Sequence, residues 1–355
     1  MYPALAVLDA LTKKHSDVEV LWVGGEGGME AGLVKRAGVP FKEIPAAGLH
    51  GVGLTRLPGN ALKIIRGIRQ SQRILADFQP DAMFFTGGFV AFPMAWAGRG
   101  IPSLLYVPDV EPGMALNALA RFASTIALTS EESRTYFKDQ TKLAVTGYPV
   151  RPNIGNITRA KARQQFGITA GDEKKVLLVF GGSKGARSIN QALMYRLTEI
   201  LPLAEVIHIS GELDWPQVSA FRASLPVALR DAYHAYPYLH EEMGAAMAAA
   251  DLVVSRAGAS SLGEFPHFGL PAVLVPYPYA WRYQKVNADS LATHGAAEVL
   301  EDGLLQSSLG VVVKNLLTNR PKLAVMKRAM ERLNKPNAAS DIAELLYGLP
   351  EAKRA

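Results

Sequence analysis

Short apolar segments rich in β-branched residues alternate with longer helical patterns, and this alternation runs through two successive series. The first series places apolar segments at residues 18–23, 82–85, 102–107, 126–128 and 143–145, and the second at 175–180, 204–209, 252–255 and 272–276. Strands that alternate with helices form parallel sheets with helices on both faces. The sequence therefore predicts an α/β fold with two doubly wound domains.

A stretch rich in Pro, Gly, Asn and charged residues, 147–173, separates the two series. The chain has 355 residues, a length that accommodates two domains of about 150 residues each. We expect an N-terminal domain over residues 1–150 and a C-terminal domain over 151–335. A helical segment over 336–355 is expected to pack back on the N-terminal domain.

The composition excludes several classes of protein. The chain has no cysteine, which rules out disulfides, a thiolate zinc site and a cysteine nucleophile. Hydrophobic residues make up 49% of the sequence, too many for a disordered chain. No apolar run reaches the roughly 20 residues that span a bilayer, and the first residues do not resemble a signal peptide.

The net charge of +6 is modest, but its distribution is uneven. The segment from Arg56 to Arg73 has no acidic residue and five basic ones, namely Arg56, Lys63, Arg66, Arg69 and Arg73. Leu62, Ile65, Ile68 and Leu75 recur between them at helical spacing. A basic amphipathic helix can lie on an anionic membrane, and an ordinary surface helix with a solvated charged face is the alternative. No aromatic residues interleave with the charges, so we expect no nucleic acid partner. We assign most of the chain's positive charge to this one segment.

Two glycine-rich turns, at residues 86–89 and 181–187, each follow a predicted strand. Such turns either bind an anion through backbone N–H groups or are merely tight connections. Neither turn has the spacing of a nicotinamide-binding or a P-loop motif. Since no Asp-x-Asp pair stands near either turn, we expect no metal and no cofactor.

A third turn, residues 255–264, follows the predicted strand at 252–255 and is made of small residues. Ser260 and Ser261 can cap a helix. Glu264 lies about one helical turn further on, where it can reach a ribose diol or simply complement the helix dipole. Beyond the next strand, Gln284 and Asn287 can bind sugar hydroxyls or an acetamido group, or be ordinary surface amides.

Taken in order, these motifs resemble those of the MurG family, the UDP-N-acetylglucosamine:lipid-linked muramyl-pentapeptide glucosaminyltransferases. The resemblance covers nearly the whole chain, through residues 2–5, 28–34, 47–51, 86–93, 147–151, 181–187, 208–211, 256–264 and 287–288. It implies the GT-B architecture, in which two Rossmann-like domains face each other across a cleft. The N-terminal domain would then be the acceptor and membrane side, and the C-terminal domain would bind the nucleotide-sugar.

The resemblance also implies roles for particular residues. Arg151 would pair with the donor diphosphate, Ser183 would line the same site, and Leu239 or His240 would contact the uracil. Glu264 would bind the ribose. The rest of the nucleotide would be held by Arg256, Gly258, Ala259, Ser260, Ser261, Leu262 and Gly263. Gln284 and Asn287 would contact the sugar, and Tyr283 stands where the family has a further glutamine.

On the acceptor side the resemblance points to Gly87, Gly88, Phe89 and Asp109. The family begins with a strand and a glycine-rich loop that carries a histidine, and this sequence starts after that loop. We therefore expect the first sheet to lack a strand and to have unpaired backbone groups. The family's His-Glu-Gln-Asn motif corresponds to residues 106–109, with Asp109 in the Asn position. Asp109 or Glu111 is the candidate general base, and either is equally consistent with a loop carboxylate or a helix cap.

The implied reaction is an inverting transfer of N-acetylglucosamine (GlcNAc) from UDP-GlcNAc to the 4-hydroxyl of undecaprenyl-linked N-acetylmuramyl-pentapeptide, a step of peptidoglycan synthesis. The implied location is peripheral, on the cytoplasmic face of the cell membrane, with residues 56–73 on its anionic surface. Two alternatives remain at this stage. The chain is either a transferase of the same fold with another lipid acceptor, or a non-catalytic nucleotide-sugar-binding relative.

Overall fold

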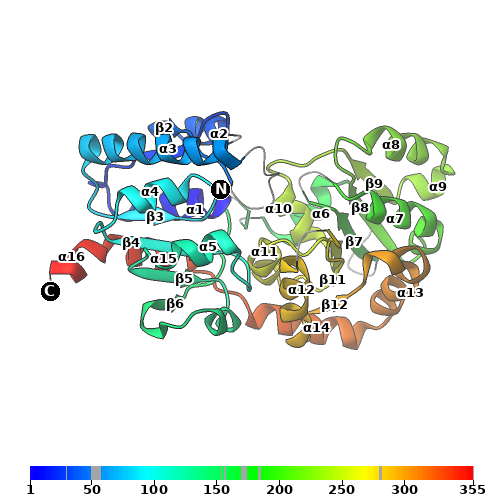
Figure 1. The fold of residues 1–355 in the computed structure, drawn as a ribbon. Helices are drawn as coiled ribbons and strands as arrows, with labels where there is room; N and C mark the ends of the chain where they lie inside the picture. The colour runs from blue at the N-terminus through cyan, green and yellow to red at the C-terminus, as the bar shows by residue number, and fades with distance from the viewer. Residues whose placement is uncertain are drawn as a thin grey trace. The chain divides into compact units, whose positions relative to one another are not determined.

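The computed structural model describes residues 1–354 except 29, 49–56, 153, 156, 169–173, 183–184 and 280–281. The chain divides into two compact units (Figure 1). Unit 1 comprises Met1–Arg151 together with Asn337–Ala355, and unit 2 comprises Pro152–Pro336.

The strands of unit 1 are all parallel and form two sheets. One sheet pairs β1 (Trp22–Gly25) with β2 (Phe41–Ile44). The other has the order β3 (Met83–Phe85), β4 (Ser103–Val107), β5 (Thr125–Leu128) and β6 (Leu143–Val145). The helices are α1 (Tyr2–Lys14), α2 (Glu30–Arg36), α3 (Leu57–Phe78), α4 (Ala91–Ala97), α5 (Met114–Leu119), α15 (Ala338–Tyr347) and α16 (Leu349–Arg354), with short 3-10 turns η2 (Glu131–Tyr136) and η3 (Gln140–Lys142).

Helix α15, near the C-terminus, packs against α1 and β4, so this late segment of the chain belongs to unit 1. Ile342 and Ala343 of this helix are buried. At its outer end, the ring of Tyr347 stacks on His15 with 3.6 Å between ring centroids, and His15 Nε2 lies 3.0 Å from a Glu344 carboxylate oxygen. The buried side chains of α15 and its contacts with His15 therefore both hold this helix in unit 1.

Unit 2 is built on one parallel sheet with the order β12-β11-β10-β7-β8-β9. Its strands are β7 (Lys175–Phe180), β8 (Ala204–Ile209), β9 (Tyr233–Tyr236), β10 (Leu252–Ser255), β11 (Ala272–Leu274) and β12 (Ala297–Val299). Its helices are α6 (Arg159–Gln165), α7 (Arg187–Ile200), α8 (Trp215–Ser224), α9 (Val227–Arg230), α10 (Met243–Ala249), α11 (Ser261–Phe268), α12 (Tyr283–Thr293), α13 (Leu305–Thr318) and α14 (Arg320–Arg332), with the 3-10 turn η4 (Asp302–Leu304).

The central strands of both units are buried along their whole length, which explains why their sequences are continuous apolar segments. Every residue of β8 and β10 is buried, as is every residue of β4 in unit 1. A parallel sheet covered by helices on both faces leaves its inner strands no exposed side. The predicted fold class, α/β with two Rossmann-like domains, is confirmed.

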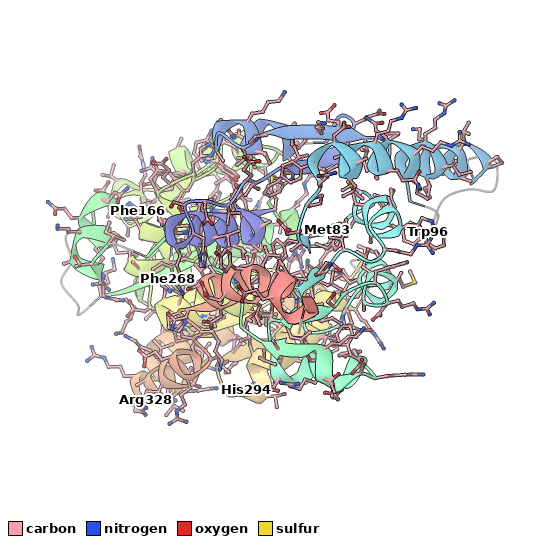
Figure 2. All side chains as sticks on the ribbon, turned by 90° about the vertical axis from the view of Figure 1, so that its left-hand side faces the viewer. Met83, Trp96, Phe166, Phe268, His294 and Arg328 are labelled. Carbon is pink, nitrogen blue, oxygen red and sulfur yellow. The ribbon has the colours of Figure 1, made fainter. Side chains whose placement is uncertain are left out.

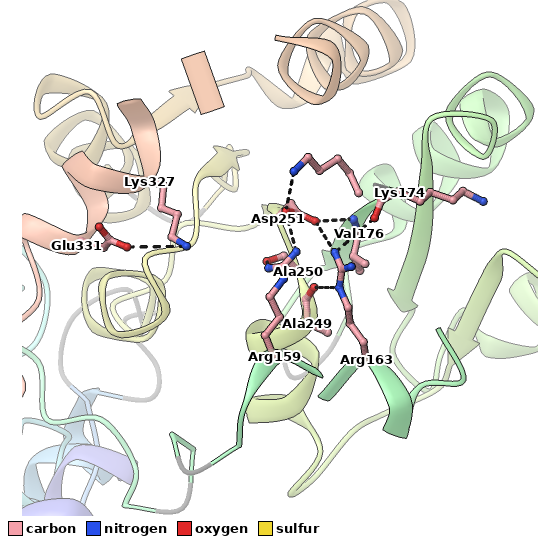
Figure 3. Close-up of polar contacts among 10 residues, drawn as sticks. Arg159, Arg163, Lys174, Val176, Ala249, Ala250, Asp251, Lys327 and Glu331 are labelled. Atoms are coloured by element: carbon pink, nitrogen blue, oxygen red, sulfur yellow. Dashed lines mark hydrogen bonds and ion pairs between the residues drawn. The ribbon is translucent and has the colours of Figure 1, made fainter. Parts of the chain in front are cut away.

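Asp251 joins helix α6 to the sheet of unit 2 at the amino end of β10 (Figure 3). The Arg163 guanidinium lies 3.1 Å and the Arg159 guanidinium 2.8 Å from its carboxylate, and the backbone N–H of Val176 donates to it over 2.8 Å. Arg163 is buried and also donates to the carbonyl of Ala249. A single carboxylate therefore compensates a buried guanidinium and fixes the start of β7.

None of the helices in the described residues is both long enough and apolar enough to cross a bilayer.

Candidate functional site

The strand order of unit 2 locates a ligand site. From β7 the chain first builds outward through β8 and β9, and then returns to add β10, β11 and β12 on the other side. The direction of winding therefore reverses between β7 and β10. In open parallel sheets, ligands bind beyond the carboxyl ends of the strands at such a reversal. The turns after β7 and β10 are the two glycine-containing turns, 181–187 and 255–264, and they lie side by side.

The turn after β7 depends on the glycine at position 185. Gly185 has φ +76°, and a Cβ there would lie 2.3 Å from the carbonyl oxygen of Ser210. Any amino acid with a side chain would be strained at this backbone conformation and would clash with the Ser210 carbonyl, so position 185 requires glycine. Ser183, predicted to line the donor site, lies outside the described residues.

A buried polar network holds the Ser210 carbonyl under this turn. Asn190 of α7 donates from Nδ2 to Ser210 O over 2.8 Å and to the Asp214 carboxylate over 2.9 Å. Its Oδ1 must therefore accept, so His208 Nε2, 2.9 Å away, is the donor. His208 Nδ1 then accepts from the Tyr233 hydroxyl over 2.6 Å. The Asn190 contact places a proton on Nε2, and burial keeps the imidazole neutral, so Nδ1 is the unprotonated nitrogen.

Burial lowers the pKa of His208 to about 3. In the unfolded chain His208 has its ordinary pKa of 6.5. Between pH 6.5 and about 3 the unfolded chain therefore binds a proton at His208 that the folded chain does not bind. We expect the free energy of unfolding to drop by about 1.4 kcal/mol for each pH unit below 6.5 on this account. The slope of the unfolding free energy against pH is measured by urea unfolding between pH 6.5 and 4.5, with hydrogen exchange in β8 as the probe of unit 2.

The variant His208→Gln is the matched control, because its amide can donate to Asn190 and accept from Tyr233 but does not titrate. We expect this variant to lack the slope contributed by His208. Equal slopes in both proteins would contradict the assignment of a neutral histidine to this position.

The turn after β10 leads directly into helix α11. The Ser261 hydroxyl donates to the Gly258 carbonyl over 2.6 Å, so it closes the turn. Glu264 is buried in the first turn of the helix. The position that a Cβ of Gly258 would occupy has no neighbouring atom within 4 Å. A ligand can therefore reach the main chain here, beside a helix N-terminus whose dipole favours an anion.

Arg256 is tied into the frame around this turn. Its guanidinium lies 2.6 Å from the Asp302 carboxylate and donates to the Ser188 hydroxyl over 2.9 Å and to the Val275 carbonyl over 3.2 Å. Ser188 in turn donates to Asp302 over 2.7 Å. The side chain thus links the start of α7, the turn after β10 and η4, and we infer a positioning role for it.

The two predicted amides differ in their surroundings. Asn287 is buried and donates to the carbonyl of Ala257 over 3.1 Å, which supports the turn after β10 from below. Gln284 accepts through Oε1 from the backbone N–H of Tyr277 over 2.9 Å, an exposed interaction. Tyr283 lies beside Gln284 at the start of α12 and is partly exposed, and Leu239 is partly exposed after β9. Of the two amides, only that of Gln284 is partly exposed, since Asn287 is buried.

In unit 1, the predicted acceptor-side residues lie beyond the carboxyl ends of β3 and β4. Gly87 and Gly88 have φ +96° and +90°, which a side chain would disfavour. The ring of Phe89, 65% exposed, lies against Gly48. Asp109 is partly exposed, whereas Glu111 is 7% exposed.

Asp109 and Arg151 have aromatic neighbours in unit 1. Burial and the charges of Tyr148 and Asp109 raise the pKa of Tyr106, whose hydroxyl lies 2.7 Å from Thr129 Oγ1. Arg151 is the last residue of the first segment of unit 1, and its guanidinium lies 4.8 Å from the centroid of the Tyr2 ring.

In the part of the chain that the structure describes, no three His, Asp or Glu residues form a possible metal site.

Ser188, Asn190, His208 and Asp302 support the site and were not singled out as site residues from the sequence. The pair of polar residues at 188 and 190 in the first turn of a helix was the available signal for two of them. His208 lies in a predicted strand, and only its buried partners reveal what it does.

Comparison with protein families agrees with this architecture. Residues 1–128 match the glycosyltransferase family 28 N-terminal domain, and residues 176–346 match the glycosyltransferase family 28 C-terminal domain. The chain is therefore built from the two domains of a family 28 glycosyltransferase.

Curated relatives narrow this class. A protein of Desulforamulus reducens is 37% identical over 96% of this chain and 93% of its own length, and one of Desulforudis audaxviator is 37% identical over 98% and 95%. Both are named UDP-N-acetylglucosamine--N-acetylmuramyl-(pentapeptide) pyrophosphoryl-undecaprenol N-acetylglucosamine transferase. The crystal structure of Acinetobacter baumannii MurG matches with a TM-score of 0.76 and 27% identity, covering 98% of this chain and 95% of that one. The chain belongs to the MurG family, and the resemblance seen in the sequence is confirmed.

Proposed function

We propose that this chain transfers GlcNAc from UDP-GlcNAc to the 4-hydroxyl of undecaprenyl-linked N-acetylmuramyl-pentapeptide. The observation that carries the proposal is 37% identity, over 96% of the chain, to a transferase named for this donor and acceptor. The switch-point site of unit 2 supports it, because a helix N-terminus and an open glycine suit a diphosphate. The enzyme is an N-acetylglucosaminyltransferase.

The donor is proposed to bind at the turns after β7 and β10. The start of α11 faces the diphosphate, Glu264 binds the ribose, and Gln284 donates its amide N–H to the sugar. Ser183, Leu239 and the remaining residues of 258–263 complete the donor site, and Arg151 pairs with the diphosphate. Arg256 and Asn287 hold the turn in place through Asp302 and the Ala257 carbonyl.

The chemistry follows from the charges that develop. A bond forms between the acceptor 4-oxygen and the anomeric carbon, while the bond from that carbon to the diphosphate oxygen breaks, with inversion. UDP leaves with increased negative charge, which oriented N–H groups and the α11 dipole stabilise. The proton of the 4-hydroxyl passes to a general base. We assign this role to Asp109 because its carboxylate is partly exposed, whereas Glu111 is buried. Gly87, Gly88 and Phe89 form the neighbouring acceptor surface.

The decisive experiment measures transfer of labelled GlcNAc from UDP-GlcNAc to lipid-linked N-acetylmuramyl-pentapeptide by the purified chain. Product on this acceptor, with release of UDP, is expected. Transfer only to another lipid acceptor would overturn the acceptor assignment. Calorimetric binding of UDP-GlcNAc without turnover on any acceptor would show a non-catalytic binding protein.

Helix α3 is proposed to hold the enzyme on the cytoplasmic face of the cell membrane. Leu62 and Ile65 are each 48% exposed, although α3 packs other residues against its unit. At 100° per residue, Arg66, Arg69 and Arg73 fall on the same outward face. Exposed apolar side chains among arginines suit an anionic bilayer surface. Arg56, at the start of the basic segment, lies outside the described residues.

Neutralising the α3 arginines in the variant R66Q/R69Q/R73Q is expected to weaken binding to phosphatidylglycerol vesicles by about a hundredfold, since each cation near an anionic surface contributes about 1 kcal/mol. Vesicle sedimentation measures it. The control K35Q/K138Q/K161Q removes the same charge from exposed lysines on other surfaces. An equal loss in both variants would mean that net charge alone drives binding.

A further inference from the structure

A second basic segment carries as much positive charge as the one around α3. Residues 319–336 contain six basic side chains, namely Arg320, Lys322, Lys327, Arg328, Arg332 and Lys335, and one acid, Glu331. Their net charge of +5 equals that of residues 56–73. Because the whole chain carries +6, everything outside these two segments is net −4. The assignment of most of the positive charge to residues 56–73 alone was therefore wrong, since each unit has one concentrated basic segment.

Helix α14, which forms most of the second segment, is anchored by one apolar face. Leu323, Met326 and Met330 are buried, and the helix packs against α11 and α13 of unit 2. At 100° per residue, these three side chains point in one direction, and Arg328 and Arg332 point the opposite way. Figure 2 shows Arg328 on the outer side of this helix.

Arg328 and Arg332 on the outward face, Arg320 at the start of the helix and Lys335 just beyond its end are not neutralised by nearby acids. Lys322 pairs with Glu298, and Lys327 lies 3.9 Å from Glu331, a contact drawn in Figure 3. Among the residues that the structure describes, Arg320, Arg328, Arg332 and Lys335 have no carboxylate within 4.0 Å, and all four are exposed.

An apolar residue lies within this charged face. Val325 is 55% exposed, and by helical geometry it lies close to Arg332 on the outward side. Ala324 beside it is also exposed. The same combination, arginines around exposed aliphatic residues, occurs on α3 with Leu62 and Ile65.

We propose that the outward face of α14 binds the headgroups of anionic phospholipids, so that unit 2 has a membrane contact of its own. Arginine guanidinium groups bind phosphate oxygens in a bidentate manner, and an exposed valine can enter the headgroup boundary. The segment has no aromatic residue on which bases could stack, which disfavours single-stranded nucleic acid. This inference concerns a different unit from α3 and does not depend on the transfer reaction.

The test compares full-length proteins by sedimentation with vesicles of phosphatidylcholine containing increasing phosphatidylglycerol. The α14 variant is R320Q/R328Q/R332Q, which leaves the buried face and the paired lysines intact. Wild type and the lysine variant K35Q/K138Q/K161Q are the matched controls. Hydrogen exchange of β7 and β8 checks that unit 2 of the variant is folded, and the transfer assay tests the proposed function separately.

We expect the α14 variant to bind phosphatidylglycerol vesicles about a hundredfold more weakly than wild type, while the lysine control changes little. The loss should vanish on vesicles of phosphatidylcholine alone. Wild-type vesicle binding in the α14 variant would overturn the proposal, as would an equal loss in the lysine control. Intact vesicle binding combined with lost binding of a single-stranded oligonucleotide would overturn it in favour of nucleic acid.

Discussion

Replacing Asp109 with asparagine is expected to lower the kcat of GlcNAc transfer by about a hundredfold to ten-thousandfold, the usual contribution of a general base. Asparagine keeps the size and polarity of the side chain but cannot accept the proton of the acceptor hydroxyl. Asp109 follows β4 in unit 1, and the proposed nucleotide contacts other than Arg151 lie in unit 2. The affinity for UDP-GlcNAc, measured by calorimetry, should therefore stay unchanged while turnover falls.

Glu111→Gln is the matched control, because it changes the other candidate carboxylate, which is 7% exposed. We expect it to retain most of the turnover of the wild-type chain. A large loss of kcat in Glu111→Gln with full activity in Asp109→Asn would transfer the role of base to Glu111. Activity in both variants would mean that neither carboxylate takes the proton.

Replacing Asp251 with alanine is expected to destabilise unit 2 by about 3–5 kcal/mol, because it leaves the buried Arg163 guanidinium without its counter-charge. Asp251 also accepts the backbone N–H of Val176, so the start of β7 loses a partner. Hydrogen exchange of β7 and β10 reports the loss locally, and exchange in β4 and β5 of unit 1 should be unaffected. Such separate readouts are needed because a chain of two units need not unfold in one step.

Arg159→Ala provides the comparison, since Arg159 pairs with the same carboxylate but is about one-third exposed. We expect it to cost roughly 1 kcal/mol or less, as solvent screens an exposed pair. If Asp251→Ala and Arg159→Ala had equally small effects, the cluster in Figure 3 would be a surface feature and not a buried clamp.

Most of the strands, and the turns of the proposed site, followed from local sequence. The strands β2, β9 and β12 were not predicted, and β1 begins four residues later than the segment expected at 18–23. The buried strands β7, β8 and β10 fall on the predicted apolar segments, because a strand covered on both faces needs apolar side chains throughout. The glycine-containing turns follow these strands as predicted. The basic helix predicted around residues 56–73 is α3, with Leu62 and Ile65 on its exposed side.

The roles of individual polar residues could not be read in the same way. Ser261 and Asn287 were expected to contact the nucleotide or its sugar, yet their polar atoms bond to the carbonyls of Gly258 and Ala257. Arg256 bonds to Ser188, 68 residues away in the chain. These residues stay in the proposed donor site, and the structure adds a positioning role that spacing along the sequence does not reveal.

By itself, the sequence determined the α/β class, two Rossmann-like domains, the MurG family and the glycine-containing turns of the proposed donor site. The spacing of apolar residues indicates the strands and helices, the glycines mark the turns, and the order of the motifs indicates the family. All three signals can be read from short stretches of sequence. Only the tertiary structure decided that the switch point lies between β7 and β10, that His208 is held neutral, and that α14 has an unneutralised outward face. Each of these depends on which distant segments pack together, because burial and hydrogen-bond partners are set by neighbours in space.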